Sequence, residues 1–233
     1  MYKRQVNDNI LLSNVLLSDA VMFEMLFPKE ASFVVKAYEE FTLQSATSIA
    51  ERFGRDIGHI SRVSSVAIEI YDKMKKLHGY KSRERTLLQV SAILQDIGKY
   101  VNVKNHALLS YNTITNLDIV GINDHERLII ATVCYYHNGN IPSMDSPIYN
   151  QLSQEDRVMV SKLAAILQIS NAINTSHSPK FEQVSVNMKN GKLNIYLTTL
   201  KNINLEKWAF IAKSKLFKEV YGLNATIIKR GVL

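Results

Sequence analysis

The sequence predicts a mainly α-helical protein whose helical domain is followed by a small α+β appendage. From residue 31 to residue 175, apolar residues recur at the spacing of three and four that gives a helix one buried face. After Pro179 the pattern changes to two short stretches in which apolar and polar residues alternate, as is typical of strands. A chain of 233 residues is also long enough for one large core with a small addition.

The expected helices follow one another closely. Residues 31–53 show helical spacing, and a second helix is expected over residues 56–77. Ser82 is the expected N-cap of a third helix, whose last buried turn carries Gln95 and Asp96. Three further helices are expected over residues 106–116, 124–136 and 153–175.

The appendage is expected over residues 181–233, in the order strand, strand, helix, strand. Asn190-Gly191 lies between the two alternating stretches and is a strong signal for a two-residue type I′ turn. The expected strands cover residues 184–188, 193–197 and 225–228, and the expected helix covers residues 205–221.

Residues 1–28 are interpreted as the remnant of a preceding domain. A strand over residues 10–17 and a helix over residues 18–27, closed by Pro28, would have too few partners to bury their apolar side chains. Since the first five residues match nothing around them, we expect the chain to begin at a truncation. The helical domain is then expected over residues 29–180.

The composition excludes some classes of protein and favours one class of partner. No apolar run approaches the ~20 residues that span a bilayer, and no secretory signal is present, so we expect a cytoplasmic protein without membrane contact. The single cysteine, Cys134, agrees with a reducing compartment. Lys and Arg outnumber Asp and Glu by 28 to 21, and the formal net charge of +7 favours polyanionic partners.

The positive charge gathers around one predicted helix junction and in the last part of the chain. A Lys or Arg cluster can be an ordinary solvated helix face, which is the alternative for either region. The residues that we expect to bind phosphate groups are Lys75, Lys76, Arg83, Arg85, Lys99, Lys213 and Lys215.

The predicted helices also carry residues that look like the ligand set of a metal-dependent phosphohydrolase. In the complete pattern an imidazole, a His-Asp dipeptide and a distant Asp converge on one divalent ion. Here Gln95 stands where the His of the dipeptide would precede Asp96, and Asn171 stands where the distant Asp would be. Because neutral amides are poor ligands for such an ion, we expect a relict pocket with no bound metal and no catalytic residue. Its expected members are His59, Gln95, Asp96, His106, His137 and Asn171.

Two alternatives apply to these polar residues. An inward His59 or His137 can be a hydrogen-bonded core residue, and His106 can belong to the pocket or begin an exposed helix. Asn171 shares a helical face with Asn174, which places it inward, so we expect these amides, Gln95 and His59 to satisfy one another by hydrogen bonds.

The segment 83–100, with Gln95-Asp96 near its end, resembles the HD-type helix of the exopolyphosphatase/guanosine pentaphosphate phosphatase (Ppx/GppA) family. Tyr135-Tyr136-His137 and the segment 163–177 are similar to two further stretches of the same C-terminal region. In this family, two actin-like domains bind and cleave the terminal phosphoanhydride with the help of a divalent metal. The C-terminal helical domain helps to hold the polyphosphate and forms a dimer.

The resemblance implies an HD-like module of a hydrolase, preceded in its parent protein by actin-like domains that supply the catalysis. We expect it to bind polyphosphate or another phosphate polyanion, or to mediate homodimerisation or regulation, and to use no cofactor. The alternative is an active metal-dependent HD phosphohydrolase that acts on nucleotides or alarmones and binds a divalent metal weakly. The sequence leaves open whether the chain by itself is an enzyme.

Overall fold

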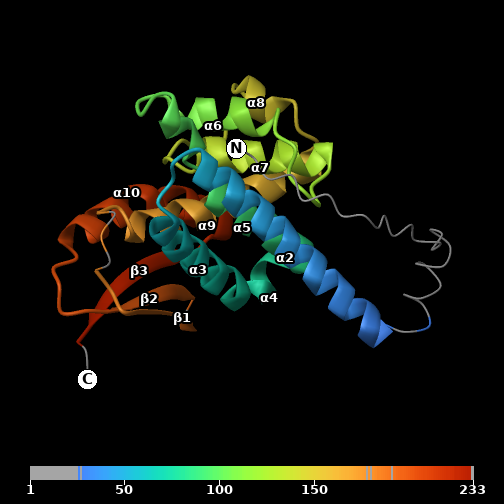
Figure 1. The fold of residues 1–233 in the computed structure, drawn as a ribbon. Helices are drawn as coiled ribbons and strands as arrows, with labels where there is room; N and C mark the ends of the chain where they lie inside the picture. The colour runs from blue at the N-terminus through green and yellow to red at the C-terminus, as the bar shows by residue number, and fades with distance from the viewer. Residues whose placement is uncertain (1–25, 27, 177, 179, 190, 232–233) are drawn as a thin grey trace, which may run out of the picture. The chain divides into compact units, whose positions relative to one another are not determined.

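The computed structural model describes residues 26, 28–176, 178, 180–189 and 191–231 (Figure 1). Apart from Leu26, the strand and the helix predicted before Pro28 lie outside these residues. The chain divides into two compact units, Met1–Glu40 and Phe41–Leu233, and helix α2 (Pro28–Arg52) begins in the first and ends in the second. Helix α2 starts three residues before the predicted position.

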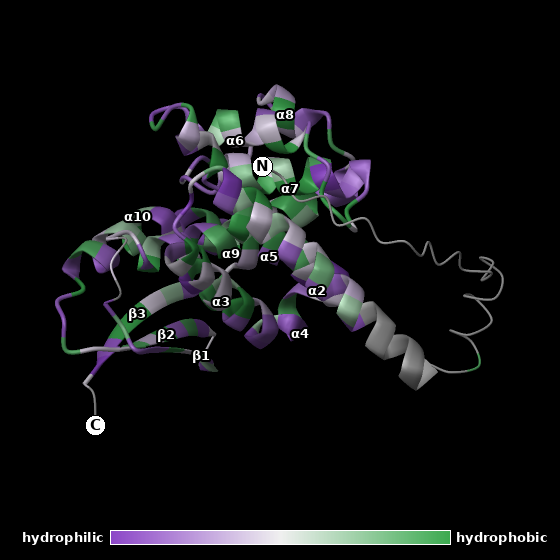
Figure 2. Cartoon of the chain, viewed as in Figure 1, coloured by the Kyte–Doolittle hydropathy of each residue, from purple (hydrophilic) through white to green (hydrophobic). Residues whose placement is uncertain are grey.

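The second unit confirms the mainly helical prediction. Its helical part consists of α3 (Ile57–Lys73), α4 (Lys75–His78), α5 (Ser82–Leu94), the 3₁₀ helix η1 (Ile97–Tyr100), α6 (His106–Ile114), α7 (Asp124–Tyr136), α8 (Pro147–Asn150) and α9 (Gln154–Ile173). Helix α9 is central, because every residue from Leu163 to Ser170 is buried and α3, α7 and α10 all pack against it. Figure 2 shows hydrophobic residues interleaved with hydrophilic ones on α5 and α7, whereas α4 is largely hydrophilic.

The second and the third of the predicted helices differ from the prediction in ways that the structure explains. The helix expected over residues 56–77 is divided at Met74, whose backbone leaves the helical conformation (φ −96°, ψ 8°) while its side chain stays fully buried. Ser82 is the first helical residue of α5 and not its cap. The cap is Lys81, whose backbone N–H donates to the Glu84 side chain at 2.8 Å and so closes one half of a capping box.

The appendage has the predicted order of strand, strand, helix and strand. Strands β1 (Gln183–Lys189) and β2 (Lys192–Thr198) form an antiparallel hairpin, helix α10 (Asn204–Tyr221) follows, and β3 (Asn224–Arg230) pairs with β2 in parallel. Leu193, Ile195 and Leu197 on one face of β2 belong to the same continuous apolar core as the helices. The domain boundary proposed at residue 181 therefore marks a change of architecture within one core.

Among the described residues, no helix is both long and apolar enough to cross a bilayer.

Candidate functional site

Three side chains from different elements meet at the end of helix α5. Asp96 precedes η1, His106 begins α6, and His137 directly follows the last residue of α7. The distance from Asp96 Oδ1 to His137 Nε2 is 3.2 Å, that from Asp96 Oδ1 to His106 Nε2 is 3.6 Å, and the two Nε2 atoms are 3.3 Å apart. All three residues are buried. This group is called the Asp-His-His cluster below.

Backbone carbonyl groups hold both imidazole rings of the Asp-His-His cluster. The Nδ1 atom of His106 lies 2.7 Å from the carbonyl oxygen of Val103, and that of His137 lies 2.5 Å from the carbonyl oxygen of Cys134. Because a carbonyl oxygen only accepts, Nδ1 carries the proton in both rings. In the neutral rings, each Nε2 therefore presents a lone pair toward the other and toward Asp96.

The Asp96 carboxylate is ionised. Burial by itself raises the pKa of Asp96, but His137, when its ring is protonated, and the Lys99 ammonium outweigh this effect and hold the pKa well below its ordinary range. Lys99 donates to Asp96 Oδ2 at 2.7 Å, whereas the two histidines face Oδ1. The carboxylate is thus fixed from one side and presents Oδ1 to the imidazoles.

Gly98 and Ser110 set the position of α6 against η1. The Ser110 hydroxyl donates to the carbonyl oxygen of Gln95 at 2.8 Å and accepts from the backbone N–H of Gly98 at 2.9 Å. A Cβ atom at residue 98 would lie 2.5 Å from the backbone nitrogen of Ser110 and closer still to the carbonyl oxygen of His106. Only glycine allows this approach, and the approach brings His106 to Asp96.

In the structure, the residues of the predicted relict pocket do not all belong to the Asp-His-His cluster. His59 is buried and pairs with Asn174, whose Nδ2 lies 2.9 Å from the His59 Nδ1. Asn171, which the sequence predicts to lie inward, is partly buried. The amide that contacts His59 is that of Asn174, which follows the last residue of α9 and has left the helical conformation (φ −111°, ψ 26°).

Gln95 is buried, but its side chain lacks the hydrogen-bond partners that the sequence predicted. Its side chain is 1% exposed, and neither its amide oxygen nor its amide nitrogen has a hydrogen-bond partner among the described residues. Buried polar atoms without such partners are rare in proteins.

Two of the predicted phosphate-binding lysines belong to the surroundings of the Asp-His-His cluster. Lys99 contacts Asp96 directly, and the Lys213 side chain of α10 lies next to Gly139, two residues beyond His137. Burial lowers the pKa of Lys213, the nearby Asp96 carboxylate raises it and Lys99 lowers it further. Lys213 forms no hydrogen bond or ion pair within the described part of the chain.

The other predicted phosphate-binding residues lie away from the cluster. Arg83 donates to both carboxylate oxygens of Glu126 and to the Gly121 carbonyl, and Arg85 donates to both oxygens of Asp72. These two guanidinium groups tie helices together and are already occupied. Lys75 and Lys76 on α4 and Lys215 on α10 are exposed, and Lys215 lies 3.9 Å from Glu219.

Sequence reasoning named His106 and His137 as members of the pocket, and it did not predict the contact between Gly98 and Ser110. A glycine followed by a serine twelve residues later has no recognisable signal, because the two meet only when η1 packs on α6.

Comparison with known families supplies the last observation. Residues 43–217 match the family model described as Ppx/GppA phosphatase, domain III. The matched range contains the whole Asp-His-His cluster and most of the appendage.

Proposed function

Because the chain belongs to the Ppx/GppA phosphatase family, through its domain III, we propose that it serves a parent hydrolase by binding phosphate polyanions, polyphosphate first among them. In this proposal the domain holds the polymer and leaves the cleavage of the phosphoanhydride to the actin-like domains.

The observation that carries this proposal is the uneven distribution of charge. Residues 180–230 contain ten Lys and Arg against three Asp and Glu, which gives this segment a formal charge of +7. The rest of the chain contains 18 residues of each sign and is formally neutral. The whole net charge of the chain is therefore carried by the part that forms β1, β2, α10 and β3.

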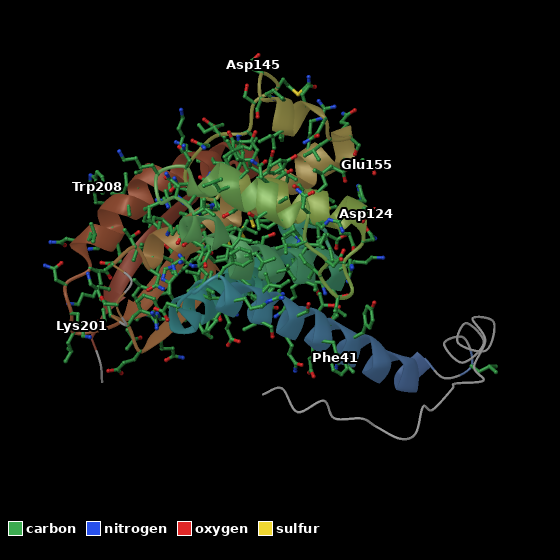
Figure 3. The ribbon with its side chains drawn as sticks, turned by 45° about the horizontal axis from the view of Figure 1, so that its top comes forward. Phe41, Asp124, Asp145, Glu155, Lys201 and Trp208 are labelled. Atoms are coloured by element: carbon green, nitrogen blue, oxygen red, sulfur yellow. The ribbon has the colours of Figure 1, made fainter. Side chains whose placement is uncertain are left out.

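Most of these cations are exposed to solvent. Their exposed members on or beside the strands and α10 are Lys189, Lys192, Lys201, Lys207, Lys215, Lys218, Lys229 and Arg230. Figure 3 shows Lys201 projecting away from the appendage. Of the three acidic residues, Glu206 is fully buried and bonded to Lys180, so it does not compete for a ligand on the surface.

Lysine ammonium groups suit a flexible chain of phosphates, because they act as point charges without a fixed geometry. A polymer of phosphate groups bound in this way releases its counterions, so the affinity falls steadily as the logarithm of the salt concentration rises. The proposal therefore predicts a steep dependence on salt.

The test measures the binding of a fluorescently labelled polyphosphate by anisotropy, at a series of salt concentrations. We expect Lys215→Gln/Lys218→Gln on α10 to weaken binding and to reduce the salt slope by about one for each phosphate group that the variant no longer binds. The matched control, Lys73→Gln/Lys104→Gln, removes the same two charges from exposed positions outside residues 180–230 and is expected to change the affinity less. An affinity that does not depend on salt, or equal losses of affinity in the two variants, would refute the proposal.

The second candidate is a metal-dependent phosphohydrolase, which the Asp-His-His cluster favours because Asp96 and two imidazoles converge there. Incubation of the purified chain with manganese and a nucleotide tests it. Turnover that disappears in Asp96→Ala would establish this activity, and no turnover in the wild-type protein would exclude it.

A homodimer and the preceding actin-like domains stay predicted partners. Sedimentation of the purified chain over a range of concentrations tests the homodimer directly.

A further inference from the structure

We propose that Asp96, His106 and His137 bind one divalent transition-metal ion. This inference goes beyond the proposed polyanion binding, and its ligand set differs from the one that the sequence suggested, since neither Gln95 nor Asn171 is needed.

The first argument is the spacing of the three donor atoms. Their separations of 3.2, 3.3 and 3.6 Å define a triangle whose three corners lie on a circle of radius about 2.0 Å. Zinc and similar ions bind imidazole nitrogen and carboxylate oxygen at about 2.0–2.2 Å. One ion close to the centre of this triangle is therefore at bonding distance from all three atoms without any movement of the side chains.

The second argument is the chemical state of the donors. Both imidazole rings donate through Nδ1 to a backbone carbonyl, which is the usual arrangement of histidines that bind a metal through Nε2. Among the described residues, no hydrogen-bond donor with suitable geometry satisfies Asp96 Oδ1. Three lone pairs thus face one another in a buried site.

A proton shared between two of the three donor atoms is the simpler explanation for such an arrangement, but it leaves one of the three atoms unsatisfied. A proton on one Nε2 makes one well-directed hydrogen bond, so it joins two of the three atoms well. The third atom would then stay buried without a partner, which is unfavourable. A divalent cation satisfies all three atoms at once.

The donor set also indicates the class of metal. Two imidazole nitrogens and one carboxylate oxygen suit zinc, manganese, iron(II) or cobalt(II), whereas magnesium and calcium prefer oxygen donors. Three protein ligands leave the remaining positions of such an ion to water. The sequence pattern predicted no metal because it grouped Asp96 with two amides. The proposed site replaces those amides with His106 and His137.

The experiment measures metal binding to the whole chain after treatment with a chelator. Calorimetric titration with zinc and with manganese gives stoichiometry and affinity, and cobalt(II) reports its coordination through its visible spectrum. We expect one ion per chain, and a loss of affinity of about tenfold or more in Asp96→Asn and in His106→Asn. His125→Asn is the control, since His125 is a histidine of another helix, exposed and paired with Asp156.

Circular dichroism and thermal unfolding show whether each variant is folded, and His137→Gln replaces any variant that is not. Absence of stoichiometric binding by the wild-type protein would overturn the proposal. So would an affinity that is unchanged in both ligand variants. The titrations contain no phosphate polymer, so their failure would leave the polyanion proposal untouched.

Discussion

The substitution Gly98→Ala is expected both to destabilise the protein and to disturb the Asp-His-His cluster. The added Cβ would lie 2.5 Å from the backbone nitrogen of Ser110 and 2.9 Å from Leu109 Cβ, whereas an ordinary contact begins at 3.4 Å. Two of the obstacles, the Ser110 nitrogen and the His106 carbonyl oxygen, belong to the backbone of α6. The start of α6 must therefore move away from η1 by about 1 Å, because no side-chain rotation relieves the clash.

The magnitude follows from two contributions. Overpacking of this kind costs about 1–3 kcal/mol. Separation of the two elements also weakens the buried bond between the Gly98 N–H and the Ser110 hydroxyl, which contributes about 1 kcal/mol. We expect the free energy of unfolding to fall by about 2–4 kcal/mol, which is a large part of the 5–15 kcal/mol that is typical of a whole domain.

Urea unfolding followed by circular dichroism measures this loss. The matched control is Gly58→Ala, because a Cβ there meets only the ends of the Asp56 and Arg62 side chains, at 3.2 and 3.3 Å. Alanine is the better helix former, so the Gly58→Ala variant is expected to keep or slightly raise the stability. If Gly98→Ala is as stable as the wild-type protein and binds metal equally well, the close approach of η1 and α6 does not position His106 as we infer.

Two further predictions concern single buried side chains. His78 accepts from the Tyr80 N–H at 3.0 Å through Nδ1, and burial lowers its pKa below the ordinary 6.5, so the folded state favours the neutral ring. The unfolded state then binds more protons, and stability should fall as the pH drops below about 6.5, by at most about 1.4 kcal/mol per pH unit. Urea unfolding between pH 7.5 and 5.5 should show a smaller fall for His78→Asn, and equal falls would contradict this. Cys134 is fully buried, and burial raises the pKa of its thiol. Ellman's reagent should therefore react with it only after unfolding, and rapid reaction of the native protein would be inconsistent with this position.

Local signals account for the part of the fold that could be predicted. Gly79 and Gly222 end helices with positive φ, as expected from their places after apolar periodic segments. The hairpin register, with Lys189 opposite Lys192, follows from the turn signal between them. These features depend on neighbouring residues alone. The division of the second helix at Met74 could not be predicted, because nothing in the local sequence interrupts the apolar pattern there.

The candidate site was predictable only as a set of residues. The sequence placed Asp96 at a buried helix end, and it named both histidines. It grouped Asn171, Asn174, Gln95 and His59 as mutual partners, but it did not show which pair would meet, and the structure joins Asn174 to His59. Nor did it show that Arg83 and Arg85 would each be held by a carboxylate of another helix.

The sequence by itself determined the helical class, the order of strands and helix along the appendage, and the family. It could do so because periodicity, turn residues and motif similarity are properties of continuous segments. Only the tertiary structure decided which polar atoms meet. Asp96, His106 and His137 lie on three elements, and their donor atoms come within 3.6 Å because Gly98 lets the backbone of α6 approach η1. Periodicity identifies the buried face of each helix, but the contacts between faces depend on how all the helices pack together.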